Sequence, residues 1–284
     1  MADAPAVASY RDYGINRRPI PGPLPIPDVA RVEIDIRISG KDPVLCMPQY
    51  TVRDGTTMRF ERNPNFWGSG IDLTCFSPWN SQAGYQRAGT LITPLHVLCA
   101  AHYQISSGQS ICFVTQNNQV VTRQITGSWV HPSWTSQNLY PDFQVLKLDS
   151  EVPNTISVAK ILPDYTKLSN VSKTNTVPVI AFNQAKEGII AELYEIGKTP
   201  YDIARYLPPV EPTRAKYSKS LIVGDSGSPS FLLLDGEPVL LTVCTWGGAG
   251  SGTSVAGHRD AINQGLNQMG GGYQLTLFET GNYI

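Results

Sequence analysis

The stretch of this chain best suited to chemistry is GDSGSP, residues 224–229, where one serine stands between an aspartate and a glycine at the start of an apolar run. Gly, Asp and Ser are ordinary turn residues, so the stretch fits an exposed turn between strands. It also fits a nucleophile, because N–H groups in a glycine turn can bind the oxyanion formed when a serine attacks a carbonyl. A serine becomes nucleophilic only beside a base that a third group orients, so the rest of the chain must supply both.

His102 and Asp142 are the candidates for these two roles. His102 ends the stretch LITPLHVLCAAH, whose two alanines allow a strand end to pack closely, so the histidine would lie half-exposed on a rigid element. Asp142 begins the apolar run FQVLKL, where a carboxylate at the edge of a core needs a donor such as an imidazole N–H. Alone, His102 is typical of a structural histidine and Asp142 equally of a turn. Together with Ser226, in the order His, Asp, Ser, they predict a catalytic triad.

Four stretches resemble the trypsin/chymotrypsin family of serine peptidases. LITPLHVLCAAH is similar to the family strand ending in Ala-Ala-His, and VHPSW followed by PDFQVLKL resembles its aspartate segment. GDSGSP matches the nucleophile loop, with Ser228 where glycine is commoner, and VCTWGG resembles the later strand with Ser-Trp-Gly. The resemblance covers roughly residues 60–270 and says nothing about residues 1–55. A chance origin for four such stretches in the family order is implausible.

The resemblance implies an all-β fold of two antiparallel six-stranded β-barrels with a C-terminal helix and a cleft between the barrels. We expect a Pro-rich extension over residues 1–55, a first barrel with His102 and Asp142 over 56–160, and a second barrel with Ser226 over 161–284. The chain itself agrees, because short apolar runs separated by Gly, Pro, Asn or Ser are typical of β-sandwiches and barrels.

The resemblance also implies roles for individual residues. Ser226 would attack a peptide carbonyl, His102 would move the proton, and Asp142 would orient His102, with the N–H groups of Gly224 and Ser226 holding the oxyanion. The remaining residues assigned to the site are Thr245, which would give its hydroxyl to Asp142, Trp246 and Gly247, which would pair with the substrate backbone, and Ser220, at the base of a neutral specificity pocket with Cys244 on its wall. The expected substrate is a polypeptide cut after an apolar or aromatic residue, without metal or cofactor. His96, His131 and His258 are expected to be structural.

The chain departs from the family in two respects. Tyr103, Arg87 and Ile222 stand where family members often carry disulfide cysteines. No Ile-Val-Gly-Gly-like segment precedes the first barrel, so Asp225 needs a partner other than a newly cut N-terminus, or the oxyanion turn is ordered from the start. These features resemble the bacterial or viral side of the family. One further hypothesis is that residues 1–55 form an inhibitory or chaperoning strap.

Three alternatives to a peptidase stay open. A catalytically inactive scaffold would keep the fold, but such proteins usually lose a triad residue, and all three candidates are present. An esterase would use the same triad for the same acyl transfer. A β-rich structural protein with a chance motif is the third.

The elements that must position these residues are mostly strands. Before the first barrel, RRPIPGPLPIPD favours polyproline II, and the alternation of Val32, Ile34, Ile36 and Ile38 predicts a half-buried strand. Residues 185–207 have apolar side chains near helical spacing and predict a helix followed by a second one starting at Thr199-Pro200. A helix is also expected over 257–269, and a hairpin turn at Asp235-Gly236.

Composition excludes several classes of protein. A net charge of −1 over 284 residues gives no electrostatic footprint for nucleic acid or an anionic membrane, and no apolar run approaches the roughly 20 residues of a membrane span. Five cysteines without a CxxC pair argue against zinc and a dense disulfide framework; one or two bridges stay open, although buried free thiols fit better. The first residues lack the features of a secretory signal, which fits a cytosolic chain or a secreted one whose signal was trimmed. The compartment and the oligomeric state stay open.

Overall fold

The computed structural model describes residues 23–284 except 85–86, 136, 139 and 198–200. Its strands are β1 (Tyr50–Asp54), β2 (Arg59–Arg62), β3 (Trp79–Asn80), β4 (Thr90–Thr93), β5 (His96–Cys99), β6 (Ser110–Val114), β7 (Val120–Val130), β8 (Gln144–Leu148), β9 (Lys160–Ile161), β10 (Val177–Phe182), β11 (Gly188–Ile196), β12 (Ile203–Leu207), β13 (Pro229–Leu234), β14 (Glu237–Trp246) and β15 (Ser251–Ser254). Its α-helices are α1 (Ile26–Ile38), α2 (Pro43–Cys46), α3 (Pro212–Ala215) and α4 (Arg259–Met269).

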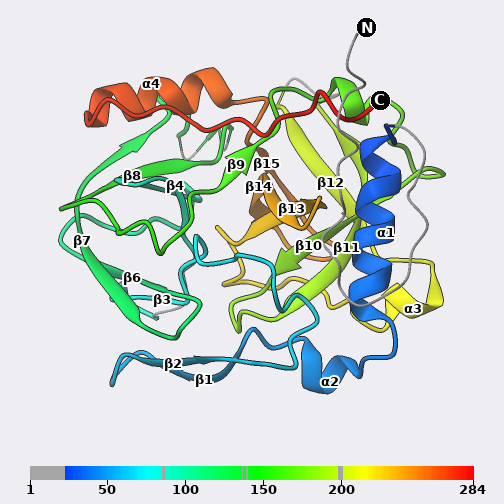
Figure 1. Cartoon of the computed structure of the whole chain (residues 1–284). Coiled ribbons are helices and arrows are strands. Elements are labelled where there is room, and N and C mark those ends of the chain that lie inside the picture. The colour runs from blue at the N-terminus through cyan, green and yellow to red at the C-terminus, as the bar shows by residue number, and fades with distance from the viewer. Residues whose placement is uncertain (1–22, 85–86, 136, 139, 198–200) are drawn as a thin grey trace, which may run out of the picture.

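Two curved sheets form the bulk of the molecule (Figure 1). One has the strand order β10-β11-β12-β15-β14-β13, and the pairing of β13 with β10 closes it into a six-stranded barrel. The other has the order β3-β6-β7-β8-β5-β4 and curls into a half-barrel. Neighbouring strands in both are antiparallel, apart from the short β9, which is added to β14 in parallel. The expected all-β, double-barrel class with a C-terminal helix is therefore confirmed, with one barrel closed and the other partly open.

The segment expected to be a strand at residues 32–38 is helix α1, so this prediction was wrong. Ile26, Ala30, Ile34 and Ile38 lie four residues apart and are all buried, which is the stripe of an amphipathic helix. When every second residue is apolar, every fourth residue is apolar too, so the same spacing fits a strand and this helix. Of the Pro-rich stretch, residues 17–22 lie outside the described residues, and Pro27 occupies the first turn of α1, where proline is tolerated.

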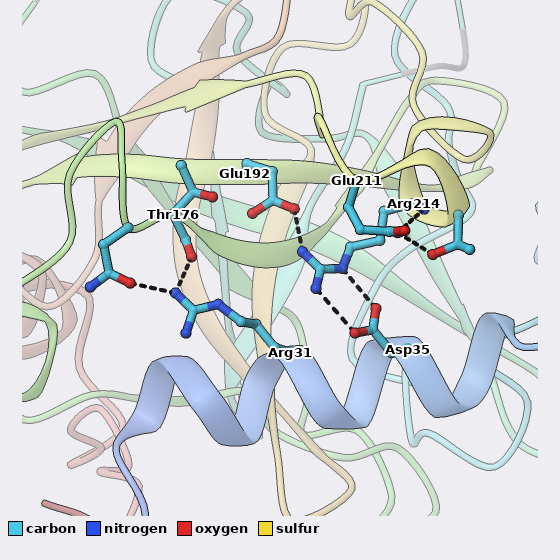
Figure 2. A network of polar contacts seen from close by, with 8 residues as sticks. Arg31, Asp35, Thr176, Glu192, Glu211 and Arg214 are labelled. Atoms are coloured by element: carbon cyan, nitrogen blue, oxygen red, sulfur yellow. Dashed lines mark hydrogen bonds and ion pairs between the residues drawn. The ribbon is translucent and has the colours of Figure 1, made fainter.

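Helix α1 lies along the outside of the closed barrel (Figure 1). Its apolar face packs on β10 and β13, and ion pairs fix its polar face (Figure 2). Arg214 of α3 donates to Asp35 of α1 at 2.7 Å and to Glu192 of β11 at 2.8 Å. Arg31 of α1 reaches the carbonyl of Thr176 at 2.6 Å. Helix α1 thus packs on the second half of the molecule, although it precedes the first half in sequence.

The helix expected over residues 185–207 is also wrong. Residues 188–196 and 203–207 are the barrel strands β11 and β12, and Thr199-Pro200 lies outside the described residues. Three of the short apolar runs, at 70–77, 220–224 and 272–279, form isolated bridges at Phe76, Leu221 and Leu277 in place of strands. Helix α4 is confirmed, with Ile262 and Leu266 buried against the half-barrel.

The predicted hairpin at Asp235-Gly236 is confirmed as the connection between β13 and β14. Both turn residues have positive φ, 51° and 78°, as a two-residue type I′ turn requires. All five cysteines are buried free thiols, as the composition favoured. None of the helices in the described part of the chain has the length and apolar character needed to cross a membrane.

Candidate active site

His102 stands three residues after the end of β5. Ala100 and Ala101 are buried, and the imidazole that follows keeps 31% of its side chain exposed. This is the half-exposed position that the small residues before it predict. The ring is therefore fixed by a rigid strand on one side and open to a reactant on the other.

Asp142 precedes β8, the strand that pairs with β5. Its side chain is fully buried, and Oδ2 lies 2.6 Å from His102 Nδ1. The other carboxylate oxygen, Oδ1, accepts the backbone N–H of His102 at 2.9 Å. Two bonds to one residue fix both the position and the orientation of the imidazole.

Ser226 lies in the turn that leads into β13 of the closed barrel. The next residue, Gly227, has φ +83°, and a Cβ there would lie 3.1 Å from Ala88 O and 3.3 Å from Ala100 N. Glycine therefore permits the turn to approach the strand end that carries His102. As a result, Ser226 Oγ lies 2.8 Å from His102 Nε2.

The structure thus brings the three sequence-predicted residues into one chain of hydrogen bonds, from Asp142 through His102 to Ser226. These are the contacts that a serine nucleophile, its base and an orienting carboxylate require. His102 and Asp142 come from the half-barrel and Ser226 from the closed barrel. The arrangement is suited to acyl transfer at a carbonyl.

The amides of Gly224 and Ser226 are available for an oxyanion. Among the described residues neither N–H has an acceptor, and Gly224 has φ +99°, a conformation that glycine adopts without strain. Between them, the buried carboxylate of Asp225 accepts the N–H groups of Gln184 and Ile222, each at 2.7 Å. These two amides are the partners of the Asp225 carboxylate in the described part of the chain.

The expected bond from Thr245 to the Asp142 carboxylate is not formed. The Thr245 hydroxyl lies 3.5 Å from that of Thr253, and Thr253 donates to the backbone carbonyl of Asp142 at 3.2 Å. The family resemblance predicts that a hydroxyl on β14 contacts Asp142. The hydroxyl that does so belongs to Thr253 on the neighbouring strand β15. Only the three-dimensional pairing of β14 with β15 identifies Thr253.

Ser220 does not form the base of a pocket, because it is exposed. The cavity behind the nucleophile turn is instead lined by Leu221, Cys244, Ser228 and Tyr206, among others, and has a volume of about 10 Å³. The backbones of Leu221 and Gly248 exchange two hydrogen bonds, at 2.7 and 2.9 Å, which join the two walls beside Ser226. The placement of Cys244 on a wall agrees with the sequence.

Trp246 lies on a second, larger cavity of about 360 Å³, which Tyr140 and Arg205 also line. Tyr140 packs between Trp246 and Tyr201, with ring centroids at 5.2 and 4.3 Å. Tyr140 was not among the predicted residues, although an aromatic residue two positions before Asp142 could have drawn attention to it. Gly247, the next residue along the chain after Trp246, is exposed.

The other histidines have structural surroundings. His96 is fully buried with Nδ1 2.8 Å from Thr93 Oγ1, His131 packs on Phe143, and His258 lies 3.1 Å from the carbonyl of Tyr201. Burial lowers the pKa of all three imidazoles, to about 4 for His96.

Arg87 and Tyr103, the positions that the family resemblance pairs as cysteines, also meet. The Arg87 guanidinium lies 4.4 Å from the centroid of the Tyr103 ring, a cation–π contact. In the described part of the chain, no three His, Cys, Asp or Glu side chains are grouped closely enough to hold a metal ion. In comparisons with known proteins, no family model and no curated protein matches this chain.

Proposed function

We propose that the protein is a serine endopeptidase that acts through an acyl-enzyme. The observation that carries the proposal is the continuous hydrogen-bond chain from buried Asp142 through half-exposed His102 to Ser226. A structural serine and histidine need neither this order of contacts nor an accessible ring. The two free amides of the GDSG turn support the same proposal.

The steps follow from these contacts. Ser226 Oγ attacks the peptide carbonyl carbon while His102 Nε2 takes its proton, and the carbonyl oxygen becomes an oxyanion held by the N–H groups of Gly224 and Ser226. The C–N bond then breaks, and His102 returns the proton to the leaving amine. Water attacks the acyl ester by the same route in reverse and releases Ser226. Asp142 holds the imidazole in one tautomer and stabilises its charged form throughout.

The neutral pocket expected from the sequence has little room. The cavity behind the nucleophile turn, of about 10 Å³, has room for about one water molecule, so we expect a small side chain on the residue that carries the attacked carbonyl (P1). We therefore propose alanine, serine or glycine at P1, in place of the apolar or aromatic residue expected from the sequence. Leu221 and Tyr206 are two of the residues that line this cavity.

The test is covalent labelling by a fluorophosphonate, read as the intact mass of the protein. We expect one adduct on the native chain and none on Ser226→Ala. Asp142→Asn should label more slowly by roughly 10⁴-fold, because the wrong imidazole tautomer is then favoured. Ser228→Ala is the matched control, since it removes a buried hydroxyl from the same turn and should label normally.

The outcomes also separate the alternatives. Labelling with turnover of esters but not of peptides would identify an esterase. Absence of labelling on the correctly folded native chain would contradict the proposal and favour a binding scaffold.

A further inference from the structure

The turn that carries Ser226 is contacted by the backbone and the side chain of one residue, Gln184, in the loop between β10 and β11. The Gln184 N–H donates to Asp225 Oδ1 at 2.7 Å, and its side-chain amide donates to the carbonyl of Val223 at 3.4 Å. A Cβ on Gly224 would lie 2.9 Å from Gln184 Oε1, so the amide fills the space left by the absent side chain. Gln184 therefore contacts three consecutive residues of the turn whose amides face the oxyanion.

The loop that carries Gln184 is held in turn by residues 46–62, which contain the β1–β2 hairpin and are called the hairpin arm below. The Gln49 N–H donates to the carbonyl of Lys186 at 3.1 Å, and the Gly188 N–H donates to that of Met47 at 2.8 Å. Arg53 of β1 donates Nη1 to the carbonyl of Gln184 at 2.5 Å. The arm thus contacts the loop near its end, at Lys186 and Gly188, and near its start, at Gln184.

Arg53 also joins the two halves of the molecule. Its Nε donates to the carbonyl of Pro78, in the segment that enters the half-barrel, at 3.1 Å. One guanidinium therefore spans the half-barrel and the loop that supports the nucleophile turn.

Two cationic side chains, Arg53 and Lys186, lie at this loop, and Arg53 is the one that donates hydrogen bonds there. Lys186 in the same loop is fully buried, its Nζ has no hydrogen-bond partner in the described part of the chain, and it lies 5.1 Å from the Phe76 ring. Burial and the neighbouring Arg53 lower the pKa of Lys186, while Asp225 and Cys112 act in the opposite direction. Burial lowers the pKa of Arg53 as well, but a guanidinium keeps its charge on burial more readily than an ammonium does.

We propose that Gln184 is a positioning residue for the oxyanion-binding turn and that Arg53 of the hairpin arm holds Gln184 in place. The arm then serves as a built-in brace that orders the turn without any cut N-terminus. This inference rests on the proposed peptidase function for its catalytic readout, but the brace itself is a structural statement about Arg53, Gln184 and Asp225.

The experiment compares Arg53→Met, Arg53→Lys and Gln184→Ala with the native chain. We expect Arg53→Met and Gln184→Ala to slow the chemical step of fluorophosphonate labelling by roughly 10- to 100-fold with little change in the binding step, because the oxyanion amides move relative to Ser226. Arg53→Lys can still reach one carbonyl and should recover part of the rate. Gln184→Ala removes the side-chain contacts to Val223 and Gly224 but keeps the backbone bonds to Asp225 and Arg53, so the double variant should be slower than either single one.

Arg62→Met is the matched control. Arg62 lies on the same hairpin and donates to the carbonyls of Val114 and Thr115, at 2.5 and 3.0 Å, with no link to Gln184. Arg53→Met and Arg62→Met therefore each remove two hydrogen bonds from the arm to backbone carbonyls. Equal slowing by Arg62→Met, or native labelling of Arg53→Met, would overturn the inference.

Hydrogen exchange provides a readout that does not depend on activity. The N–H groups of Gln184 and Ile222, which Asp225 accepts, should exchange at least roughly 10-fold faster in Arg53→Met and not in Arg62→Met. If the native chain is not labelled at all, the peptidase proposal fails, and the exchange comparison still decides whether the brace exists. Unchanged exchange at both amides would refute it.

Discussion

Ser226 and His102 belong to different halves of the molecule, and their meeting depends on single residues at close contacts. Gly227 lets the nucleophile turn approach Ala88 and Ala100, and the carboxylate of Asp142 fixes the imidazole through two bonds. A side chain at Gly227 would separate the halves without touching either reacting atom.

A second prediction at the residue scale concerns the size of the P1 side chain of the substrate. Peptides with Ala or Ser at P1 should be cleaved at least roughly 10-fold faster than peptides with Phe, because forcing extra methylenes into a filled space typically costs about 1–3 kcal/mol. Leu221→Ala should raise kcat/KM for Leu or Met at P1, since Leu221 is 5% exposed and lines the cavity. Peptide-library profiling measures both effects.

Ile222→Ala is the control for this prediction. Ile222 is the next residue along the chain but is 61% exposed, so its truncation should leave the P1 preference unchanged. Equal cleavage after Phe and Ala by the native chain would show that the pocket opens to large side chains.

The triad could be predicted from sequence because each member lies in a short local pattern, whereas its supports could not. Gln184 and Thr253 contact the site from positions 41 residues before Asp225 and 111 residues after Asp142. Neither residue has a local signature, since glutamine and threonine are ordinary loop and strand residues. The same holds for Ser220 and Leu221, where a shift of one position decides which residue faces the cavity.

At the scale of elements, Arg214 links helix α1 to the closed barrel through two carboxylates. Arg214 is 11% exposed and contacts Asp35 of α1 and Glu192 of β11, whose side chain is 4% exposed. Burial alone would lower the pKa of Arg214, but its hydrogen bonds to Asp35 and Glu192 raise it instead. The network in Figure 2 is therefore a charged contact between α1, α3 and a barrel strand.

Arg214→Met should destabilise the fold by about 3–5 kcal/mol, because it leaves the Glu192 carboxylate buried without its cation. The free energy of unfolding in urea measures this loss. Arg205→Met is the comparison: Arg205 pairs with Glu195 but is 43% exposed, so we expect a change of about 1 kcal/mol or less. Similar losses in both variants would mean that burial does not distinguish the two pairs.

Helices and strands could be predicted where the apolar residues follow one clear repeat. The prediction was wrong where the spacing of apolar residues fits both a strand and a helix. Helix α4 and the Asp235-Gly236 hairpin have single local signatures, a helical stripe before glycines and a turn dipeptide. Residues 32–38 alternate in hydrophobicity and also repeat every four residues, and burial against the barrel selects the helix. Residues 188–196 form a barrel strand that is buried over most of its length, so its apolar spacing carries no alternation.

At the scale of the whole molecule, stability should depend on pH through a buried histidine. Burial lowers the pKa of His96 to about 4 from 6.5, so between these values the unfolded chain binds the extra proton. Stability is therefore full above pH 6.5 and falls as the pH drops toward 4, by at most roughly 3 kcal/mol for this group.

Urea midpoints measured between pH 7 and pH 4 test this expectation. His96→Asn, which can keep the bond to Thr93, should show a shallower loss of stability on acidification than the native chain. Parallel pH profiles for the two proteins would assign the acid sensitivity to other groups, such as His131 and His258, whose pKa values are also lowered.

The five buried thiols give the molecule a set of internal reporters. Cys75, Cys99 and Cys112 lie in the half-barrel region, Cys244 in the closed barrel and Cys46 at the start of the hairpin arm. Burial raises the pKa of each, to about 12 for all but Cys46, so a thiol reagent can reach them as thiolates only when the surrounding region opens. The order in which the five sites are alkylated would therefore record which part of the protein opens first, with no foreign label introduced.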